Sequence, residues 1–360
     1  MWTFNQISTS TVSIVGALAG FTVSNKEPRV YYIGSSNHVY ELAYQNGKWG
    51  SSDLMSQASG APAANASSAL AGCINSDGEP RVFYTDALNH VYELVYQNGR
   101  WNYSDLTNRA VGAASTTTGS RLVAFTVSNG ELRVYYIASS HVWELAYQNG
   151  KWSSNDVTKS AKAPDSTADS ALAGFSLSNG EPRVYYISAS EPSIQELIYQ
   201  NGKWSYSNLM KKTKTPSTVQ GSPLAGFTVS SGEPRVCYID TSNHVDELAY
   251  QNGKWGSSDL TKRAGAVPAV QGSKLAGFTV SNGEPRVYYA GPNGSDNDVY
   301  ELVYQNGKWR SSNIALEAGA NHMAAKSALM GFSVSNEEPR VYYVGIKDNA
   351  NYVYELAWQA

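Results

Sequence analysis

A tyrosine-rich phrase that recurs seven times most constrains what this chain can fold into. At residues 29–49 it reads RVYYIGSSNHVYELAYQNGKW, and at 81–101 it reads RVFYTDALNHVYELVYQNGRW. The step from one copy to the next is 50 to 54 residues, which indicates an array of similar structural units. The seven copies begin at Arg29, Arg81, Arg133, Arg183, Arg235, Arg286 and Arg340.

Each unit contains four short runs with the composition of β-strands. In the first unit these are ALAGF at 17–21, RVYYI at 29–33, HVYELAY at 38–44 and KWGSSDL at 48–54. Val, Tyr, Ile and Trp dominate them, and no 3.6-residue periodicity competes. Four strands in about 50 residues are typical of a β-propeller blade. We therefore predict an all-β, seven-bladed β-propeller with four antiparallel strands per blade, as a single domain over residues 1–360.

The two ends of the chain predict how this ring closes. The seventh unit stops at ELAWQA, after its third strand, and MWTFNQIS at residues 1–8 aligns with the missing fourth strand. In that alignment Trp2 matches Trp49 and Ile7 matches Leu54. We expect residues 1–8 to form the outer strand of blade seven, which leaves no open sheet edge.

Composition excludes several classes of partner. The net charge is −3 and charged residues make up 16% of the chain without a basic or acidic run, which argues against nucleic acid. No apolar stretch approaches the roughly 20 residues of a membrane-spanning helix, so no membrane insertion is expected. Residues 1–10 lack signal-peptide features, which predicts a soluble protein made in the cytoplasm, with any export by a route that the sequence does not show. Cys73 and Cys237 lie in different units and are expected to be free, buried thiols.

Strand geometry predicts where the repeated side chains point. The Asn46-Gly47 pair favours a two-residue type I′ hairpin turn, which places Tyr44 opposite Trp49 on one face of the blade. Alternation along the strand then turns Glu41 to the other face. Arg29 lies 12 residues before Glu41, and a loop centred near Ser35 would set the two directly across from each other.

Every groove between consecutive blades therefore combines an Arg–Glu pair from one blade with two aromatic rings from the next. A guanidinium and a carboxylate together can hold adjacent sugar hydroxyls, and an aromatic face accepts the apolar side of a pyranose. Such shallow sites are weak singly but strong when several act on one surface. The predicted carbohydrate-binding residues, groove by groove, are Arg29, Glu41, Tyr96 and Trp101; Arg81, Glu93, Tyr147 and Trp152; Arg133, Glu144, Tyr199 and Trp204; Arg183, Glu196, Tyr250 and Trp255; Arg235, Glu247, Tyr304 and Trp309; Arg286, Glu301, Trp358 and Trp2; and Arg340, Glu355, Tyr44 and Trp49.

With these residues the chain resembles the fucose-binding β-propeller lectins over its full length. It is most similar to the Photorhabdus-type seven-bladed lectins and more distantly to the six-bladed Aleuria-type fungal lectins. The resemblance implies L-fucose binding between blades, by Arg and Glu of one blade with aromatic residues of the next. We predict that Arg and Glu bond the sugar hydroxyls and that Trp stacks on the sugar with Tyr as its support. It also implies no metal, no other cofactor and no catalysis. Fucosylated glycans or glycoconjugates are the implied partners, O-methylated sugars are accepted by some members, and a dimer or tetramer is common.

Some units depart from the pattern. The Arg-to-Glu spacing is 12 residues in units one, two and five, but 11 in unit three, 13 in unit four and 15 in units six and seven. Antiparallel pairing survives this if only the loop changes length. Unit four carries Pro192 near its site, unit five has Asp246 where most units have an aromatic residue, and the sixth groove depends on Trp2. We therefore expect fewer than seven working sites.

Three other interpretations remain open. The Arg–Glu pairs could be structural, although buried ion pairs stabilise poorly compared with apolar replacements. A protein-interaction propeller would use one broad face of varied loops, and competition by free L-fucose separates it from a lectin. A glycosidase needs a singular set of carboxyl groups, whereas this acidic residue occurs seven times.

No metal site is predicted. Four histidines occupy equivalent turns in different units and are too dispersed for one zinc ion: His38, His90, His141 and His244. His322 is isolated.

Overall fold

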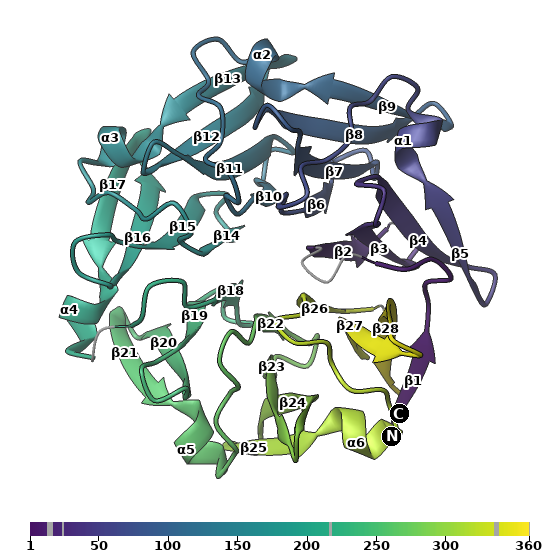
Figure 1. Cartoon of the computed structure of the whole chain (residues 1–360). Coiled ribbons are helices and arrows are strands. Elements are labelled where there is room, and N and C mark those ends of the chain that lie inside the picture. Colours follow the sequence, from purple (N-terminus) through teal and green to yellow (C-terminus); the bar gives the residue numbers. More distant parts are fainter. Residues whose placement is uncertain (13–16, 24, 216–217, 335–337, 360) are drawn as a thin grey trace.

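The chain folds into a ring of β-sheets around a central opening. The structure, a computed structural model, describes residues 1–12, 17–23, 25–215, 218–334 and 338–359. Over these residues the strands form seven four-stranded antiparallel sheets that radiate from the centre (Figure 1). The predicted seven-bladed propeller is thus confirmed. None of the helices in the described ranges is long and apolar enough to cross a membrane.

Six blades are built from consecutive strands, with the first strand at the centre and the fourth at the rim. Their strands are Leu18–Thr22, Pro28–Ile33, Val39–Gln45 and Lys48–Asp53 (β2–β5, blade 1); Ala71–Ile74, Pro80–Thr85, Val91–Gln97 and Arg100–Asp105 (β6–β9, blade 2); Val123–Thr126, Leu132–Ala138, His141–Gln148 and Lys151–Asp156 (β10–β13, blade 3); Leu172–Ser176, Pro182–Ile187, Ile194–Gln200 and Lys203–Asn208 (β14–β17, blade 4); Leu224–Thr228, Pro234–Ile239, Val245–Gln251 and Lys254–Asp259 (β18–β21, blade 5); and Leu275–Thr279, Pro285–Asn293, Asp296–Gln305 and Lys308–Asn313 (β22–β25, blade 6).

Blade 7 joins the two ends of the chain. It consists of Leu329–Ser333 (β26), Pro339–Lys347 (β27), Ala350–Trp358 (β28) and the N-terminal strand Trp2–Gln6 (β1). β1 pairs antiparallel with β28, and Trp2 lies opposite Trp358. The predicted closure by the N-terminal segment is confirmed, and the two ends lie side by side in Figure 1.

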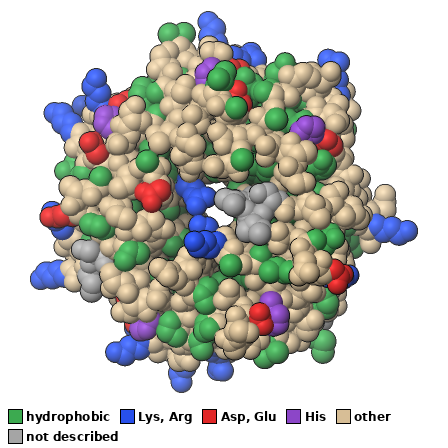
Figure 2. Space-filling model, viewed as in Figure 1, with side chains coloured by type: hydrophobic (Ala, Val, Ile, Leu, Met, Phe, Trp, Pro, Cys, Tyr) green, Lys and Arg blue, Asp and Glu red, His purple; other side chains and the backbone are tan. Residues whose placement is uncertain are grey.

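The walls of the central channel are made of small residues from the seven first strands. Leu18, Ala19 and Gly20 of blade 1 line it together with the corresponding residues of the other blades. Figure 2 shows Lys and Arg side chains at the rim of the opening, and Arg121, Lys274 and Lys326 line this mouth. The crowding of strands at the centre explains why the first run of each unit is short and rich in small residues.

One-turn helices follow the fourth strands, a feature that the sequence prediction missed. The predicted fourth run of blade 1 extends to Leu54, but the strand ends at Asp53 and Leu54 begins the helix. The Asp53 carboxylate accepts a hydrogen bond from the backbone N–H of Ser56, so it caps the turn. Within the described ranges these helices are Leu54–Gln57 (α1), Leu106–Arg109 (α2), Val157–Ala161 (α3), Leu209–Thr213 (α4), Leu260–Ala264 (α5) and Ile314–Ala318 (α6).

The hairpin between the third and fourth strands forms as predicted. Asn46 and Gly47 both have positive φ, 49° and 77°, as a type I′ turn requires. Tyr44 lies opposite Trp49, and their ring centroids are 5.4 Å apart. These two rings therefore share one face of the blade.

The predicted pairing of Arg29 directly across from Glu41 is wrong. Glu41 lies opposite Tyr31, while Arg29 lies opposite Ala43, so the arginine and the glutamate are diagonal neighbours on the same face. The connecting loop is centred one residue later than expected, because a tight turn with a left-handed Asn37 closes it. The residue opposite Arg29 is therefore two positions away from the expected one. A shift of two keeps each side chain on its face, so Arg29 and Glu41 still face away from Tyr44 and Trp49.

Changes in loop length leave this register intact. In blade 6, where the spacing is 15 residues, Glu301 still lies opposite Tyr288, because β23 and β24 simply extend further before their turn. In blade 4, Pro192 precedes β16, and Glu196 still lies opposite Tyr185. The expectation that pairing survives a change in loop length is confirmed.

Candidate functional site

Opposite faces of neighbouring blades meet in each groove, as strand parity predicted. Between blades 1 and 2, Tyr31 shares a face with Arg29 and Glu41, and its ring meets the edge of Trp101 at a centroid distance of 6.3 Å. Between blades 7 and 1, the Trp49 indole N–H donates to Glu355 Oε2 at 3.4 Å. The Arg–Glu pair of one blade therefore lies beside the aromatic pair of the next.

The other grooves repeat this contact with local variations. Edge-on contacts between a buried tyrosine and the next blade's tryptophan occur for Tyr135 and Trp204, Tyr185 and Trp255, and Tyr288 and Trp2, at 6.2 to 6.4 Å. In the second groove Phe83 replaces the tyrosine and packs in one apolar cluster with Trp152 and Tyr147. The fifth groove, with Cys237 in that position, brings Cys237 and Trp309 into one cluster.

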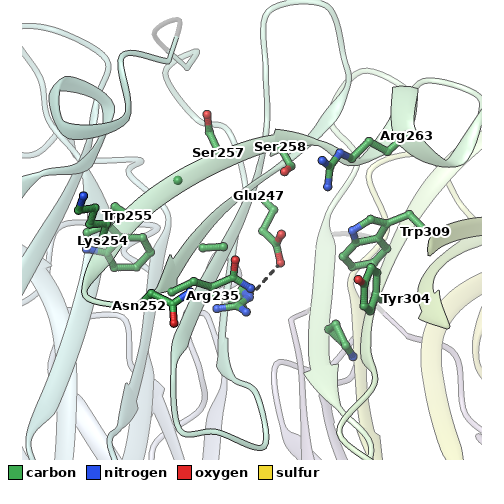
Figure 3. A pocket seen from close by; sticks show the side chains of 14 residues that line it. Arg235, Glu247, Asn252, Lys254, Trp255, Ser257, Ser258, Arg263, Tyr304 and Trp309 are labelled. Atoms are coloured by element: carbon green, nitrogen blue, oxygen red, sulfur yellow. Dashed lines mark ion pairs between the residues drawn. The ribbon is translucent and has the colours of Figure 1, made fainter. Parts of the chain in front are cut away.

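Two grooves form well-defined cavities lined by all four predicted residue types. The cavity between blades 5 and 6 has a volume of about 440 Å³, and Arg235 and Glu247 face Tyr304 and Trp309 across it (Figure 3). Arg235 Nε lies 3.3 Å from Glu247 Oε1. The cavity between blades 1 and 2 measures about 430 Å³ and is lined by Arg29, Glu41, Tyr96 and Trp101.

The arginine in each groove is held in place by several acceptors. The Arg29 guanidinium donates from Nη1 to the carbonyl oxygens of Pro28 and Tyr44, at 3.2 and 3.1 Å. Its Nη2 pairs with Glu27 Oε2 at 3.3 Å, and its Nε lies 3.8 Å from Glu41. These contacts fix a planar donor group at the inner wall of the groove.

The glutamate carboxylate is half-buried in the first groove and buried in the other six. Glu41 accepts a hydrogen bond of 2.9 Å from the Tyr31 hydroxyl. Burial raises the pKa of this carboxyl, and the Tyr31 hydrogen bond and the Arg29 charge offset the rise only in part. The same direction and leading cause hold for Glu93, Glu144, Glu196, Glu247, Glu301 and Glu355.

The two rings of the aromatic pair differ in exposure in the two grooves that form cavities, whereas in the third, fourth and seventh grooves both rings are half-buried. In the first groove Tyr96 is 40% exposed, whereas Trp101 is 4% exposed. Trp101 is occupied by its contact with Tyr31, so the accessible aromatic face in this groove belongs to Tyr96. The fifth groove repeats this difference, with Tyr304 exposed and Trp309 buried.

Sequence reasoning missed the contribution of the one-turn helices to the grooves. Gln57, the last residue of α1, lines the cavity of the first groove, and Arg263 of α5 lines that of the fifth. The available signal was the Asp or Asn that precedes an apolar residue at the end of the fourth run, which is typical of a helix N-cap.

The repeated histidines stabilise turns. His38 Nδ1 lies 2.8 Å from the Asp53 carboxylate, which caps α1, and the loop before β4 is thereby tied to the helix. The same pairing joins His90 to Asp105, His141 to Asp156 and His244 to Asp259. His322, which lies outside this repeated position, has its Nδ1 2.6 Å from Asp298. In the described part of the chain, no group of three or more His, Cys, Asp or Glu side chains is arranged to hold a metal ion. Cys73 and Cys237 are free and buried, as predicted.

Comparison with known proteins places the chain in a family. The family model for the fungal fucose-specific lectin matches residues 3–232. No curated protein sequence matches the chain at a significant level. Among solved structures, a Burkholderia pseudomallei lectin shares 13% identity with a TM-score of 0.67, over 96% of this chain and 95% of that one.

Two fungal structures are also similar. The six-bladed β-propeller lectin of Aleuria aurantia shares 17% identity, with a TM-score of 0.58 over 85% of this chain and 96% of that one. A protein of Arthrobotrys oligospora shares 15% identity, with a TM-score of 0.60 over 87% of this chain and 90% of that one. At these identities the structural likeness supports the propeller fold alone, whereas the family model covers well over half of the sequence. The chain belongs to the fungal fucose-specific lectin family and is a carbohydrate-binding lectin.

Proposed function

We propose that this chain binds L-fucose in the grooves between its blades and that several grooves act together on surfaces rich in fucosylated glycans. The observation that carries the proposal is the cavity between blades 5 and 6, where a guanidinium, a carboxylate and two aromatic rings line one space of sugar size. A family that is specific for fucose supports the choice of sugar.

Each group has a role that follows from its geometry. Arg235 donates to sugar hydroxyls from a fixed plane, and Glu247 accepts from them. Because Tyr304 exposes its ring and Trp309 is buried, we assign the stacking face for the apolar side of the sugar to Tyr304. Trp309 then packs beside Tyr304 and holds its ring in place, with the two ring centroids 5.5 Å apart. This assignment reverses the roles predicted from the sequence for the two rings.

Multivalency compensates for weak single sites. A millimolar groove contributes only about −4 kcal/mol, but several grooves on one rigid ring raise the avidity for a dense glycan surface by about 10²- to 10⁴-fold. Association into a dimer or tetramer would multiply the grooves further, and light scattering after size-exclusion chromatography measures it.

The first test compares variants of the fifth groove. We expect crystals soaked with methyl α-L-fucoside to show sugar in this groove of the unmodified protein and none after Tyr304→Ala. Arg235→Lys should lower the occupancy, because an ammonium cannot replace the planar fork. Arg235→Lys keeps a positive charge beside Glu247, and Tyr304→Ala replaces one neutral side chain by another. The fold should therefore persist in both variants, as circular dichroism would show.

The matched control is Arg121→Ala, which removes an exposed arginine at the channel mouth, away from the grooves. Its binding to a fucosylated surface, measured in buffer with a chelator, should equal that of the unmodified protein. Full occupancy of the fifth groove in Tyr304→Ala would refute the assignment. Failure of free L-fucose to compete for the glycan surface would refute the proposed function.

A further inference from the structure

One position at the lip of the grooves varies in charge from blade to blade, whereas the arginine and glutamate of the groove are the same in every blade. This lip position is the fourth residue of each one-turn helix, which follows the strand beside the groove glutamate. Its occupants are Gln57 in blade 1, Arg109 in blade 2, Ser160 in blade 3, Lys212 in blade 4, Arg263 in blade 5 and Glu317 in blade 6. The position is therefore cationic in blades 2, 4 and 5 and neutral in blades 1 and 3.

The lip residue belongs to the same cavity as the predicted sugar-binding residues. Arg263 lines the fifth groove with Arg235, Glu247 and Trp309, and Figure 3 shows it reaching over the upper edge of the cavity above Trp309. Gln57 occupies the corresponding place in the first groove. A group bound in either groove would therefore lie within reach of this side chain.

The cationic lips are close enough to act on the groove carboxylates. Burial raises the pKa of Glu247, and the charges of Arg235 and Arg263 oppose that rise. Arg109 acts in the same direction on Glu93, and Lys212 on Glu196. Over the described residues, none of the three cations forms an ion pair within 4 Å, whereas the neighbouring Lys211 pairs with Glu191.

Most of the remaining charges are shared by these grooves. Each groove carries its own Arg–Glu pair, and a lysine or arginine opens every fourth strand of blades 1 to 6. A second glutamate also pairs with the groove arginine in the first four grooves, with cationic and neutral lips alike, whereas no such pair is formed by Arg235 within the described residues. Blade 6 is a special case, since Glu317 at its lip is accompanied by Arg310 on the Arg–Glu face of β25. The clean comparison is therefore between blades 2, 4 and 5 and blades 1 and 3.

We propose that the lip residue sets which fucosylated glycans each groove accepts. The second, fourth and fifth grooves select glycans whose unit next to fucose carries an anionic group, either a sulfate or a carboxylate. The first and third grooves take neutral glycans equally well. This inference rests on the proposed function. An exposed cation contributes little in water, so we expect a preference of about two- to fivefold, which falls as salt is added.

The test reads each groove separately. Crystals are soaked in an equimolar mixture of a neutral fucosylated trisaccharide and its sulfated counterpart, and then of the neutral sugar and a counterpart with a carboxylate. The ratio of anionic to neutral ligand is refined in each groove. We expect a ratio of two to five in the second, fourth and fifth grooves with at least one of the two anions, and about one in the first and third.

Reciprocal variants connect the preference to the lip residue. Arg263→Gln should lower the ratio in the fifth groove to about one, and Gln57→Arg should raise it in the first. The matched control is Lys262→Gln, which removes the same charge from an exposed neighbour on α5 and should leave the ratio unchanged.

Two results would overturn the inference and are distinguishable from failure of the proposed function. Equal ratios in all five grooves, or equal effects of Lys262→Gln and Arg263→Gln, would overturn it while fucose binding stands. Absence of the neutral ligand from every groove would overturn the proposed function and this inference with it.

Discussion

At the scale of single residues, the groove carboxylate keeps its place while its partner varies. Glu41 accepts a hydrogen bond from Tyr31, and Glu301 accepts from both Tyr288 and Arg286. Where Cys237 replaces the tyrosine, the buried Oε1 of Glu247 accepts no hydrogen bond from the described residues and keeps only its ion pair with Arg235. Buried ion pairs stabilise poorly, so the retention of Arg and Glu despite these changes favours a binding role.

A second variation of this kind predicts a pH-dependent weakness in blade 5. Asp246 lies opposite Tyr238, where blades 1 and 2 stack two tyrosine rings. Burial first, and then the charges of the neighbouring Asp240 and Asp259, raise the pKa of Asp246 to about 7 against the opposing charge of His244. The folded state therefore holds a proton that the unfolded chain releases.

The sign of the effect follows from this proton. Below the ordinary Asp pKa of 3.8 both states are protonated, so nothing is lost. As the pH rises from 3.8 to about 7, the unfolded state is favoured increasingly, and above about 7 the loss of stability is complete and stays constant. Asp246→Asn should thus raise the free energy of unfolding by about 1–3 kcal/mol at pH 8 and by much less near pH 4. Urea unfolding at the two pH values measures this, and an equal gain at both would contradict it.

At the scale of the element, the strands and their faces could be predicted from sequence because each depends on local rules. The Asn46-Gly47 turn fixes one hairpin, and period-two alternation then fixes the faces of Tyr44, Glu41 and Arg29. The offset between Arg29 and Glu41 could not be predicted, since it depends on where the loop before β4 turns. The helices were missed because four or five residues are too few for a 3.6-residue pattern.

The first strands also carry a packing rule between blades that only the structure reveals. A Cβ atom added to Gly72 would lie 2.8 Å from the ring of Phe21 in the preceding blade, and one on Gly277 would lie 2.8 Å from Phe227. Glycine occupies this position wherever the preceding blade presents phenylalanine, because an added Cβ would lie 2.7–3.2 Å from the phenylalanine ring. Blade 3 has Ala124 at this position, and blade 2 accordingly presents the smaller Cys73.

This pairing predicts a non-additive pair of substitutions. Cys73→Phe alone should overpack against Ala124 and lower the free energy of unfolding by about 1–3 kcal/mol. Ala124→Gly alone should lower the free energy of unfolding by about 1 kcal/mol, because packing is lost and the unfolded chain gains conformational entropy. The double variant restores the arrangement of the other blades and should be more stable than Cys73→Phe. A double-mutant cycle by urea unfolding measures the coupling, and simple additivity would refute the rule.

At the scale of the whole molecule, stability and binding meet where the ring closes. β1 supplies the outer strand of blade 7 and also an aromatic wall of the sixth groove. Trp2 is 3% exposed and packs edge-on against Trp358 and Tyr288, at centroid distances of 5.7 and 6.3 Å. One residue thus joins the two ends of the chain and completes a predicted sugar site.

Trp2→Ala should therefore have two linked effects. Removing a buried indole should lower the free energy of unfolding by about 3–5 kcal/mol, because the cavity it leaves lies between two blades. It should also abolish fucoside occupancy in the sixth groove while the fifth remains filled, because the fifth takes its rings from blade 6. The matched control is Phe4→Ala on the same strand, where the ring is 41% exposed and little should change. Thermal unfolding and fucoside soaks of both variants measure the two effects. Loss of sugar from all grooves at once in Trp2→Ala would mean that closure of the ring supports every groove and not the sixth alone. Equal losses of stability in both variants would show that the backbone pairing of β1, and not the buried indole, holds the two ends together.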